Sequence, residues 1–77
     1  MNKVLFFANL KDIVGQETLQ LDLKDKTVAQ VKELLLRQYP TLPLDNCMTA
    51  VNEEFAMDTD IIKENEEVAF IPPVSGG

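Results

Sequence analysis

The four C-terminal residues are the part of this sequence best suited to chemistry. Gly76 and Gly77 form a thin backbone ribbon without side chains, and the ribbon ends in a free carboxylate. Glycine adopts backbone conformations closed to other residues, so a tunnel of bare-backbone width can admit such a ribbon. The sequence therefore predicts that Val74, Ser75, Gly76 and Gly77 are inserted into the active site of another protein.

Two prolines determine how this tail leaves the rest of the chain. Pro72 and Pro73 fix φ and disfavour helix at the preceding residue, so we expect the tail to be extended. At roughly 3.3–3.6 Å per residue, the four tail residues reach on the order of 13 Å. The alternative is a frayed chain end without a role, since termini are often disordered. The remaining sequence decides between these two interpretations.

Length and composition indicate one small globular domain. The chain has 77 residues, of which 45% are hydrophobic, and this fraction is typical of folded proteins. No apolar run approaches the ~20 residues that cross a bilayer, and Met1 leads into a strand-like pattern without a signal-peptide cleavage region. The single cysteine, Cys47, cannot form an internal disulfide. We therefore expect a soluble cytoplasmic protein with no membrane partner.

The charge argues against one class of partner. Thirteen acidic residues, seven basic residues and no histidine give a net charge of −6. Nucleic-acid binders need a basic surface that displaces counterions from phosphate, and this chain has the opposite sign. We expect no nucleic-acid partner, whereas an acidic surface keeps a protein soluble or steers it towards a basic partner.

Catalytic side chains are not recognisable in this sequence. A nucleophile–base pair needs a group that titrates near neutrality, and the chain has no histidine. Cys47 has no identifiable activating partner, so we interpret it as a small core or loop residue. The acidic residues at 64–67 match no EF-hand spacing, and Gly15 is too isolated to form a phosphate-binding loop. We expect no bound cofactor or metal, and no catalysis by this chain on its own.

Alternating hydrophobicity predicts the strands that hold the tail. The alternation extends over residues 3–9, 17–23 and 67–71, and two shorter runs at 48–51 and 54–56 flank a tight turn at Asn52 and Glu53. Residues 10–14 predict a short helical turn that Gly15 closes. Because successive strand residues face opposite sides, the side chains expected in the core are Val4, Phe6, Ala8, Leu19, Leu21, Leu23, Val68 and Phe70.

One longer helix is predicted between the second and third strands. Thr27 and Gln30 fit a capping box at its start, and Pro40 ends it near Tyr39. The apolar residues that share one face of this helix are Val28, Val31, Leu34, Leu35 and Tyr39. The element order predicts an α+β fold in which a single main helix packs on one face of the sheet. The other sheet face is then either exposed to solvent or used as an interface, and we expect Phe7, Phe55 and Ile71 on it.

Three pieces of the sequence together resemble a known family. VLFFA at residues 4–8 runs on to Gly15, the helix after Thr27 follows, and the chain ends in EVAFIPPVSGG at residues 67–77. These features resemble the small subunits of molybdopterin synthase, which are ubiquitin-like β-grasp sulfur carriers. The resemblance covers essentially the whole chain, and its ending is more specific than the Gly-Gly pair that all such carriers share. It implies a β-grasp domain with a mixed sheet at residues 1–73 and a flexible tail at 74–77.

The resemblance implies a chemical role for the tail. A carboxylate is a poor electrophile, so a partner enzyme first joins the carboxylate of Gly77 to AMP as a mixed anhydride. Sulfur then replaces AMP to give a C-terminal thiocarboxylate, and Gly76 serves as the narrow spacer behind it. The thiocarboxylate donates its sulfur to cyclic pyranopterin monophosphate, which forms the dithiolene of molybdopterin. The catalytic side chains of this family belong to the large subunit.

The resemblance also implies partners. These are the large subunit of molybdopterin synthase, in a heterotetramer of small and large subunits, and a ubiquitin-activating-like adenylyltransferase that consumes ATP. Phe7, Lys11, Phe55 and Ile71 are the expected interface residues. Ile71 stands where phenylalanine is common in the family, Lys11 stands where arginine is common, and Asn65 replaces a frequent glycine. These departures concern details of contact.

Two other functions remain open from the sequence. A carrier for thiazole or another sulfur-containing product shares the fold and the Gly-Gly end, although the thiamine carriers lack the Pro-Pro-Val ending. A protein modifier that is joined to lysines, as ubiquitin is, uses the same acyl-adenylate, and a plain interaction module belongs to the same alternative. Isolation of a thiazole synthase would favour the first alternative, and an isopeptide-linked ladder that depends on Gly77 would favour the second.

Overall fold

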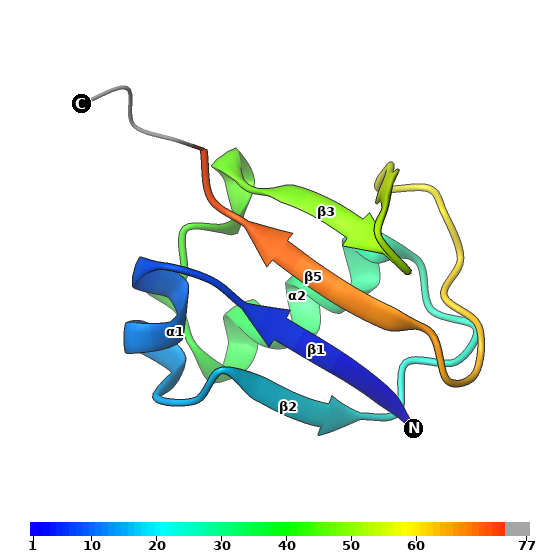
Figure 1. The fold of residues 1–77 in the computed structure, drawn as a ribbon, viewed down its shortest axis with the longest axis horizontal. Coiled ribbons are helices and arrows are strands. Elements are labelled where there is room, and N and C mark those ends of the chain that lie inside the picture. Colours follow the sequence, from blue (N-terminus) through cyan, green and yellow to red (C-terminus); the bar gives the residue numbers. More distant parts are fainter. Residues whose placement is uncertain (74–77) are drawn as a thin grey trace.

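The computed structural model describes residues 1–73 of the chain (Figure 1). The expectations for Val74, Ser75, Gly76 and Gly77 lie outside these residues. The described residues form β1 (Asn2–Phe6), α1 (Asn9–Val14), β2 (Thr18–Leu21), α2 (Val28–Gln38), the 3-10 helix η1 (Leu44–Asn46), β3 (Met48–Val51), β4 (Glu54–Ala56) and β5 (Glu67–Ile71).

The strands form one mixed sheet. Within residues 1–73 it has five strands in the order β2-β1-β5-β3-β4. The central pair, β1 and β5, is parallel, and the other neighbours are antiparallel. Helix α2 lies across one face of this sheet (Figure 1), so the predicted α+β class with one main helix is confirmed. Because β1 and β5 run in the same direction, their carboxyl ends lie at the same edge of the sheet, where α1 also lies (Figure 1).

The core lies between α2 and the sheet. Val4 and Phe6 of β1 and Val68 and Phe70 of β5 are almost fully buried there, as predicted. The rings of Phe6 and Phe70 stack with their centroids 6.2 Å apart. The other buried members of this core are Leu10, Val14, Leu23, Val28, Val31, Leu35, Leu42, Leu44 and Ile62. Burial of this apolar surface is the main source of stability in such a small domain.

The predicted capping box at the start of α2 is present. The backbone N–H of Gln30 donates to Thr27 Oγ1 at 3.2 Å, and the backbone N–H of Thr27 donates to Gln30 Oε1 at 2.8 Å. The predicted core face of this helix was wrong at one position. Leu34 does not join the core cluster, whereas Leu36, which lies on the opposite flank, packs against it. Both leucines border the apolar face, and the position of the sheet decides which of them is covered.

The first strand is shorter than predicted, and Ala8 is not a core residue. Strand β1 ends at Phe6, and Ala8 is exposed with φ 53° and ψ −132°. This backbone conformation reverses the chain, so that Leu10 N donates to Phe7 O at 3.1 Å and α1 begins. The predicted strand continued through Ala8 because the alternation of apolar and polar residues contains no information about a change of backbone direction.

The turns follow their residue types. Asn52 and Glu53 have φ values of 50° and 69°, which is the left-handed pair expected of a tight two-residue hairpin. Asn65 has φ 67°, and asparagine tolerates this region better than most residues. Gly15 ends α1 in the left-handed region at φ 84°, as predicted from its position.

Candidate functional site

The sheet face that α2 leaves uncovered has a contiguous apolar surface. Cross-strand pairing places Leu5 opposite Ala69, Ala69 opposite Ala50, and Ala50 opposite Phe55. The next row pairs Ile71 with Met48, and residues opposite each other in a sheet project from the same face. We define the outer apolar face by its large side chains: Leu5, Phe7, Met48, Phe55 and Ile71.

These large side chains are accessible to a partner. Phe55 is 73% exposed, Met48 47% and Phe7 46%, whereas Leu5 and Ile71 are half-buried. Single exposed apolar residues are common, but a contiguous patch on a small protein indicates a contact surface. The predicted exposure of Phe7 and Phe55 is confirmed, and their contacts with a partner remain a prediction.

The tail begins at the end of this face. Phe6 is the parallel neighbour of Phe70, so Phe7 and Ile71 follow at the same edge of the sheet. Pro72 is half-buried and Pro73 is exposed at that edge. A protein that covered the outer apolar face would therefore lie directly beside the point at which residues 74–77 begin.

Lys11, another predicted contact residue, lies on α1 near Phe7. Its Nζ is 3.6 Å from Glu17 Oε1, and both side chains are largely exposed. Exposed pairs of this length contribute little to stability and are screened by salt. Lys11, Phe7 and Leu5 line a shallow depression of about 200 Å³. The ammonium of Lys11 is thus available to a partner acid without disturbing the fold.

The structure adds Met48 and Leu5 to the predicted set. Both are outward-facing, and neither was predicted as a contact from the sequence. The signal that identifies them is strand register, because Met48 becomes a candidate only once it is opposite Ile71. Register between strands that are distant in the chain does not follow from periodicity within one strand.

The surroundings of Cys47 do not favour a reactive thiolate. Its Sγ donates a hydrogen bond to the carbonyl oxygen of Pro43 at 3.2 Å. Burial raises the pKa of the Cys47 thiol above its ordinary value, and the positive charge of Lys32 only opposes this effect. The thiol is therefore protonated at neutral pH, and the thiolate is the reactive form. This environment agrees with the interpretation of Cys47 as a structural residue.

Residues 1–73 present neither a metal-binding cluster nor a membrane-spanning helix. No group of three or more His, Cys, Asp or Glu residues in this range is arranged to hold a metal ion. None of the helices in the same range is long and apolar enough to span a membrane.

Comparison with known proteins identifies the family. Residues 4–77 match the model of the ThiS family. The molybdopterin synthase sulfur carrier subunit of Dictyostelium discoideum is 38% identical over 97% of this chain and 94% of its own length. The crystal structure of SAMP1, the small archaeal modifier protein 1 of Haloferax volcanii, superposes with a TM-score of 0.83 at 28% identity, covering 99% of this chain and 98% of that chain.

A third protein shares the fold at lower identity. It comes from the complex of subunits 1 and 2 of the molybdopterin-converting factor of Helicobacter pylori, and it superposes with a TM-score of 0.73 at 22% identity over 99% of this chain and 97% of its own. At this identity the likeness concerns the fold alone. The strand order, the single main helix and these superpositions define a ubiquitin-like β-grasp fold. The family match runs from the first strand through both C-terminal glycines, and the chain therefore belongs to the ThiS family.

Proposed function

We propose that this protein is the sulfur carrier subunit of a molybdopterin synthase. The observation that carries the proposal is the whole-length similarity to a subunit of that name, at 38% identity. The family match also includes Gly76 and Gly77, the residues that the chemistry needs. The accessible apolar face beside the base of the tail supports a role in which the globule docks and the tail reaches a partner's active site.

The proposed chemistry takes place at the carboxyl carbon of Gly77. A carboxylate oxygen attacks the α-phosphorus of ATP, which releases pyrophosphate and leaves an acyl-adenylate. Sulfide from a sulfur donor then attacks the acyl carbon and displaces AMP, which leaves a thiocarboxylate. The thiocarboxylate sulfur attacks cyclic pyranopterin monophosphate, and hydrolysis of the resulting thioester returns the carboxylate. The adenylating enzyme consumes the ATP, so this chain needs no bound cofactor of its own.

The chain's own residues supply position rather than catalysis. Pro72 and Pro73 limit the conformations of the backbone that leads into the tail. Gly76 lets the chain enter a passage too narrow for side chains. The outer apolar face, with Lys11 at its margin, docks on the partner. In this proposal the catalytic side chains belong to the large subunit, with which the chain forms a heterotetramer.

The adenylating partner and the compartment complete the proposal. A ubiquitin-activating-like adenylyltransferase binds the same chain before the large subunit does, so the two enzymes use one tail in turn. Both reactions take place in the cytoplasm, where ATP is available and where a protein without disulfides is stable.

The test is the mass of the C-terminus after reaction. Incubation with the adenylyltransferase, ATP and a sulfur donor is expected to replace one carboxylate oxygen by sulfur at Gly77, detected by mass spectrometry of the C-terminal peptide. A variant that lacks Gly77 is expected to show no such change. Its free energy of unfolding should stay within about 0.5 kcal/mol of wild type, because an exposed terminus contributes little burial. A wild-type chain that never forms an adenylate or a thiocarboxylate would refute the proposal.

A protein modifier is the second candidate function. The likeness to SAMP1 at 28% identity favours it, and the two functions share the acyl-adenylate step. They differ in the nucleophile, which is a sulfur donor for the carrier and a lysine amine for the modifier. An isopeptide-linked ladder that disappears when Gly77 is deleted would support the modifier. Recovery of a thiazole synthase, rather than a large synthase subunit, would instead indicate a carrier for thiamine synthesis.

A further inference from the structure

Strand β2 forms one edge of the sheet. Within residues 1–73 it is last in the strand order and pairs with β1 alone, and Figure 1 shows no other segment beyond it on the side away from β1. The free side of an edge strand presents backbone N–H and C=O groups that can pair with another strand. The hydrogen bonds and side chains of β2 therefore determine whether this edge can accept one.

The register of β2 on β1 shows which of its backbone groups are free. The backbone N–H of Phe6 donates to the carbonyl oxygen of Glu17 at 2.9 Å, one residue beyond the ladder of paired residues. Hydrogen-bonded and non-hydrogen-bonded pairs alternate along an antiparallel ladder. The N–H and C=O groups of Thr18 and Gln20 therefore point away from β1. No other segment of residues 1–73 bonds to them.

The composition of β2 favours pairing. Its four residues, Thr18–Leu21, include no charge, proline or glycine, although 26% of the chain is charged. Proteins that stay monomeric usually protect an exposed edge with a charge, a proline or a bulge. Leu19 and Leu21 are only partly buried against the core, so apolar surface is also left at this edge. Strand β2 thus lacks the features that keep a second strand away.

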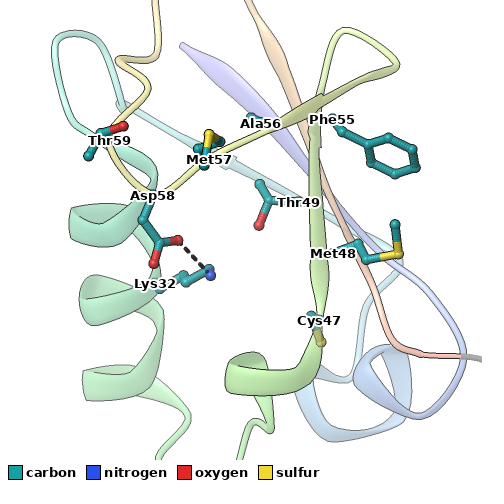
Figure 2. Close-up of a pocket in the computed structure, with 9 residues that line it drawn as sticks. All are labelled: Lys32, Cys47, Met48, Thr49, Phe55, Ala56, Met57, Asp58 and Thr59. Carbon is teal, nitrogen blue, oxygen red and sulfur yellow. Dashed lines mark hydrogen bonds and ion pairs between the residues drawn. The ribbon is translucent and has the colours of Figure 1, made fainter.

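The opposite edge of the sheet is protected. Strand β4 has only three residues, Glu54–Ala56, and Figure 2 shows the chain leaving β3 after Ala56 towards α2. Lys32 Nζ on α2 donates to Asp58 Oδ1 there at 2.8 Å. This charged pair lines the cavity of about 440 Å³ that remains beside β3. A departing chain and charged side chains discourage strand pairing at this edge.

A second, antiparallel copy of β2 fits the free edge. With a two-fold axis at Gln20, each Gln20 lies opposite the other, each Thr18 lies opposite Asp22, and each Leu19 lies opposite Leu21. The outward N–H and C=O groups of Thr18 and Gln20 then form reciprocal hydrogen bonds. Two leucine pairs meet on the side of α2, and on the other side a threonine hydroxyl faces a carboxylate that accepts its proton.

Other two-fold registers fit less well. An axis at Leu19 would place Leu21 opposite Glu17 of the other copy, which sets an apolar side chain against a carboxylate. An axis at Leu21 would place Leu19 opposite Leu23, whose side chain is fully buried in its own domain. The side chains of β2 therefore select the axis at Gln20.

We propose that this chain forms a symmetric dimer with a second copy of itself through β2, so that two five-stranded sheets join into one. Opposite charges meet at both ends of this contact, because Glu17 before one β2 lies near the segment after the other β2, which carries Lys24. A contact of this kind buries the same patch on both copies. The inference does not depend on the proposed function.

The symmetry of the dimer leaves the predicted contact surfaces open. Antiparallel strands that join two sheets edge to edge are related by an axis perpendicular to the sheet. Both outer apolar faces then lie on the same side of the joined sheet. The edges at which the two tails begin point in opposite directions, because the strands of the two copies run in opposite directions. The dimer therefore presents two docking faces and two separate tails.

Sedimentation velocity of the full chain over a concentration series tests the dimer. A single strand edge buries less than the roughly 1,200–2,000 Å² of stable complexes, so we expect a weak equilibrium between monomer and dimer. The sedimentation coefficient is expected to rise with concentration. A coefficient that stays at the monomer value up to about 1 mM, the weak end of measurable association, would overturn the inference.

Gln20→Lys tests the position of the contact, because it sets two ammonium groups opposite each other at the axis. The dissociation constant of the dimer is expected to rise at least about fivefold. The melting temperature should not change, since Gln20 is exposed in the single chain. Gln38→Lys makes the same change at an exposed position of α2 and should leave the dimer as it is. Equal dissociation constants for the two variants would exclude a contact at β2.

Cysteine cross-linking tests the register. In a Cys47→Ser background, Gln20→Cys places two thiols opposite each other, with the Cα separation of about 5.5 Å that a disulfide accepts. Oxidation is expected to give a covalent dimer. Asp22→Cys, also at an exposed position, should cross-link poorly alone and well when mixed with Thr18→Cys chains. Equal cross-linking of Gln20→Cys and Asp22→Cys would indicate random collision and would refute the register.

The same measurements separate other outcomes. If Phe55→Lys removes the dimer and Gln20→Lys does not, the copies meet through the outer apolar face and the inference is wrong. If the wild-type chain forms the thiocarboxylate but sediments only as a monomer, the inference fails and the proposed function stands. A dimer that depends on Gln20, in a chain that never forms the thiocarboxylate, would support the inference and refute the proposed function.

Discussion

At the scale of single residues, Asn2 connects three segments of the chain. Its side-chain Nδ2 donates to the carbonyl oxygens of Lys63 and Glu66, each at 2.8 Å. Its Oδ1 accepts from the backbone N–H of Leu23 at 3.0 Å. The residue is fully buried, so its bond to Leu23 is shielded from water and its two bonds to the turn are partly shielded. Asn2 therefore links the start of β1 to the two segments beside it, and this polar side chain is as buried as the apolar core residues.

We predict that Asn2→Ala lowers the free energy of unfolding by about 1–3 kcal/mol, because it leaves the buried N–H of Leu23 and two partly buried carbonyl oxygens without partners. Urea unfolding followed by circular dichroism measures this change. Asn46→Ala, at an exposed asparagine of η1, is the control and should stay within about 0.5 kcal/mol of wild type. Similar values for the two variants would show that water replaces the Asn2 side chain without cost.

At the scale of the elements, the junction between β1 and α1 has a strained backbone. Ala8 precedes α1 with φ 53° and ψ −132° and makes no side-chain capping bond. A residue with a β-carbon rarely adopts a positive φ, whereas glycine adopts it readily. The junction is nevertheless important, because it sets the direction in which Phe7 and α1 leave the sheet. The buried Leu10 and Val14 of α1 hold it in place.

We predict that Ala8→Gly raises the free energy of unfolding by about 1 kcal/mol, since relief of the strain exceeds the added entropy of the unfolded chain. Thermal unfolding is the measurement. Ala29→Gly, at an exposed position in the first turn of α2, makes the same chemical change at an ordinary helical position and should lower stability by about 0.5–1 kcal/mol. If both variants lose stability, the Ala8 conformation carries no strain.

At the scale of the whole molecule, the two sheet faces have different tasks. One face packs against α2 and forms part of the buried core. The other is the outer apolar face, with its exposed large side chains. The parallel pairing of β1 with β5 brings the carboxyl ends of both strands to one edge of the sheet (Figure 1). Phe7 follows β1 at this edge, and Pro72 follows β5. In this arrangement a substitution on the outer face can change binding without a comparable change in folding.

We predict that Phe7→Arg weakens binding of the large subunit at least tenfold. Loss of an aromatic contact at the centre of an interface usually lowers the binding free energy by about 2 kcal/mol. The free energy of unfolding should fall by less than about 1 kcal/mol, because the ring is already 46% exposed. Gln38→Arg adds the same charge at an exposed position at the end of α2 and should alter neither quantity. A large fall in melting temperature for Phe7→Arg would mean that the ring supports the core.

Much of the fold could be predicted from local patterns. Thr27 and Gln30 identify a helix start because their side chains bond to backbone groups within the same turn. Asn52, Glu53 and Asn65 identify turns through backbone conformations that depend on the residue itself. The predictions for Ala8 and Leu34 were wrong because they depend on tertiary packing. Packing of α1 sets the backbone angles at Ala8, and the rotation of α2 about its axis decides whether Leu34 is in the core. The predictions of the helix start and the turns succeeded because they concern interactions between residues that are close in the chain.

The sequence by itself determined the Gly-Gly end, the approximate positions of the strands, the capped helix and the lack of a histidine base, since each depends on residue types and short spacings. The tertiary structure decided which segments of the chain are neighbours in space. It paired β1 with β5, placed Met48 opposite Ile71, and buried Asn2. These features depend on register and packing between segments distant in the chain. The energies that select them are sums over many contacts that no local pattern contains.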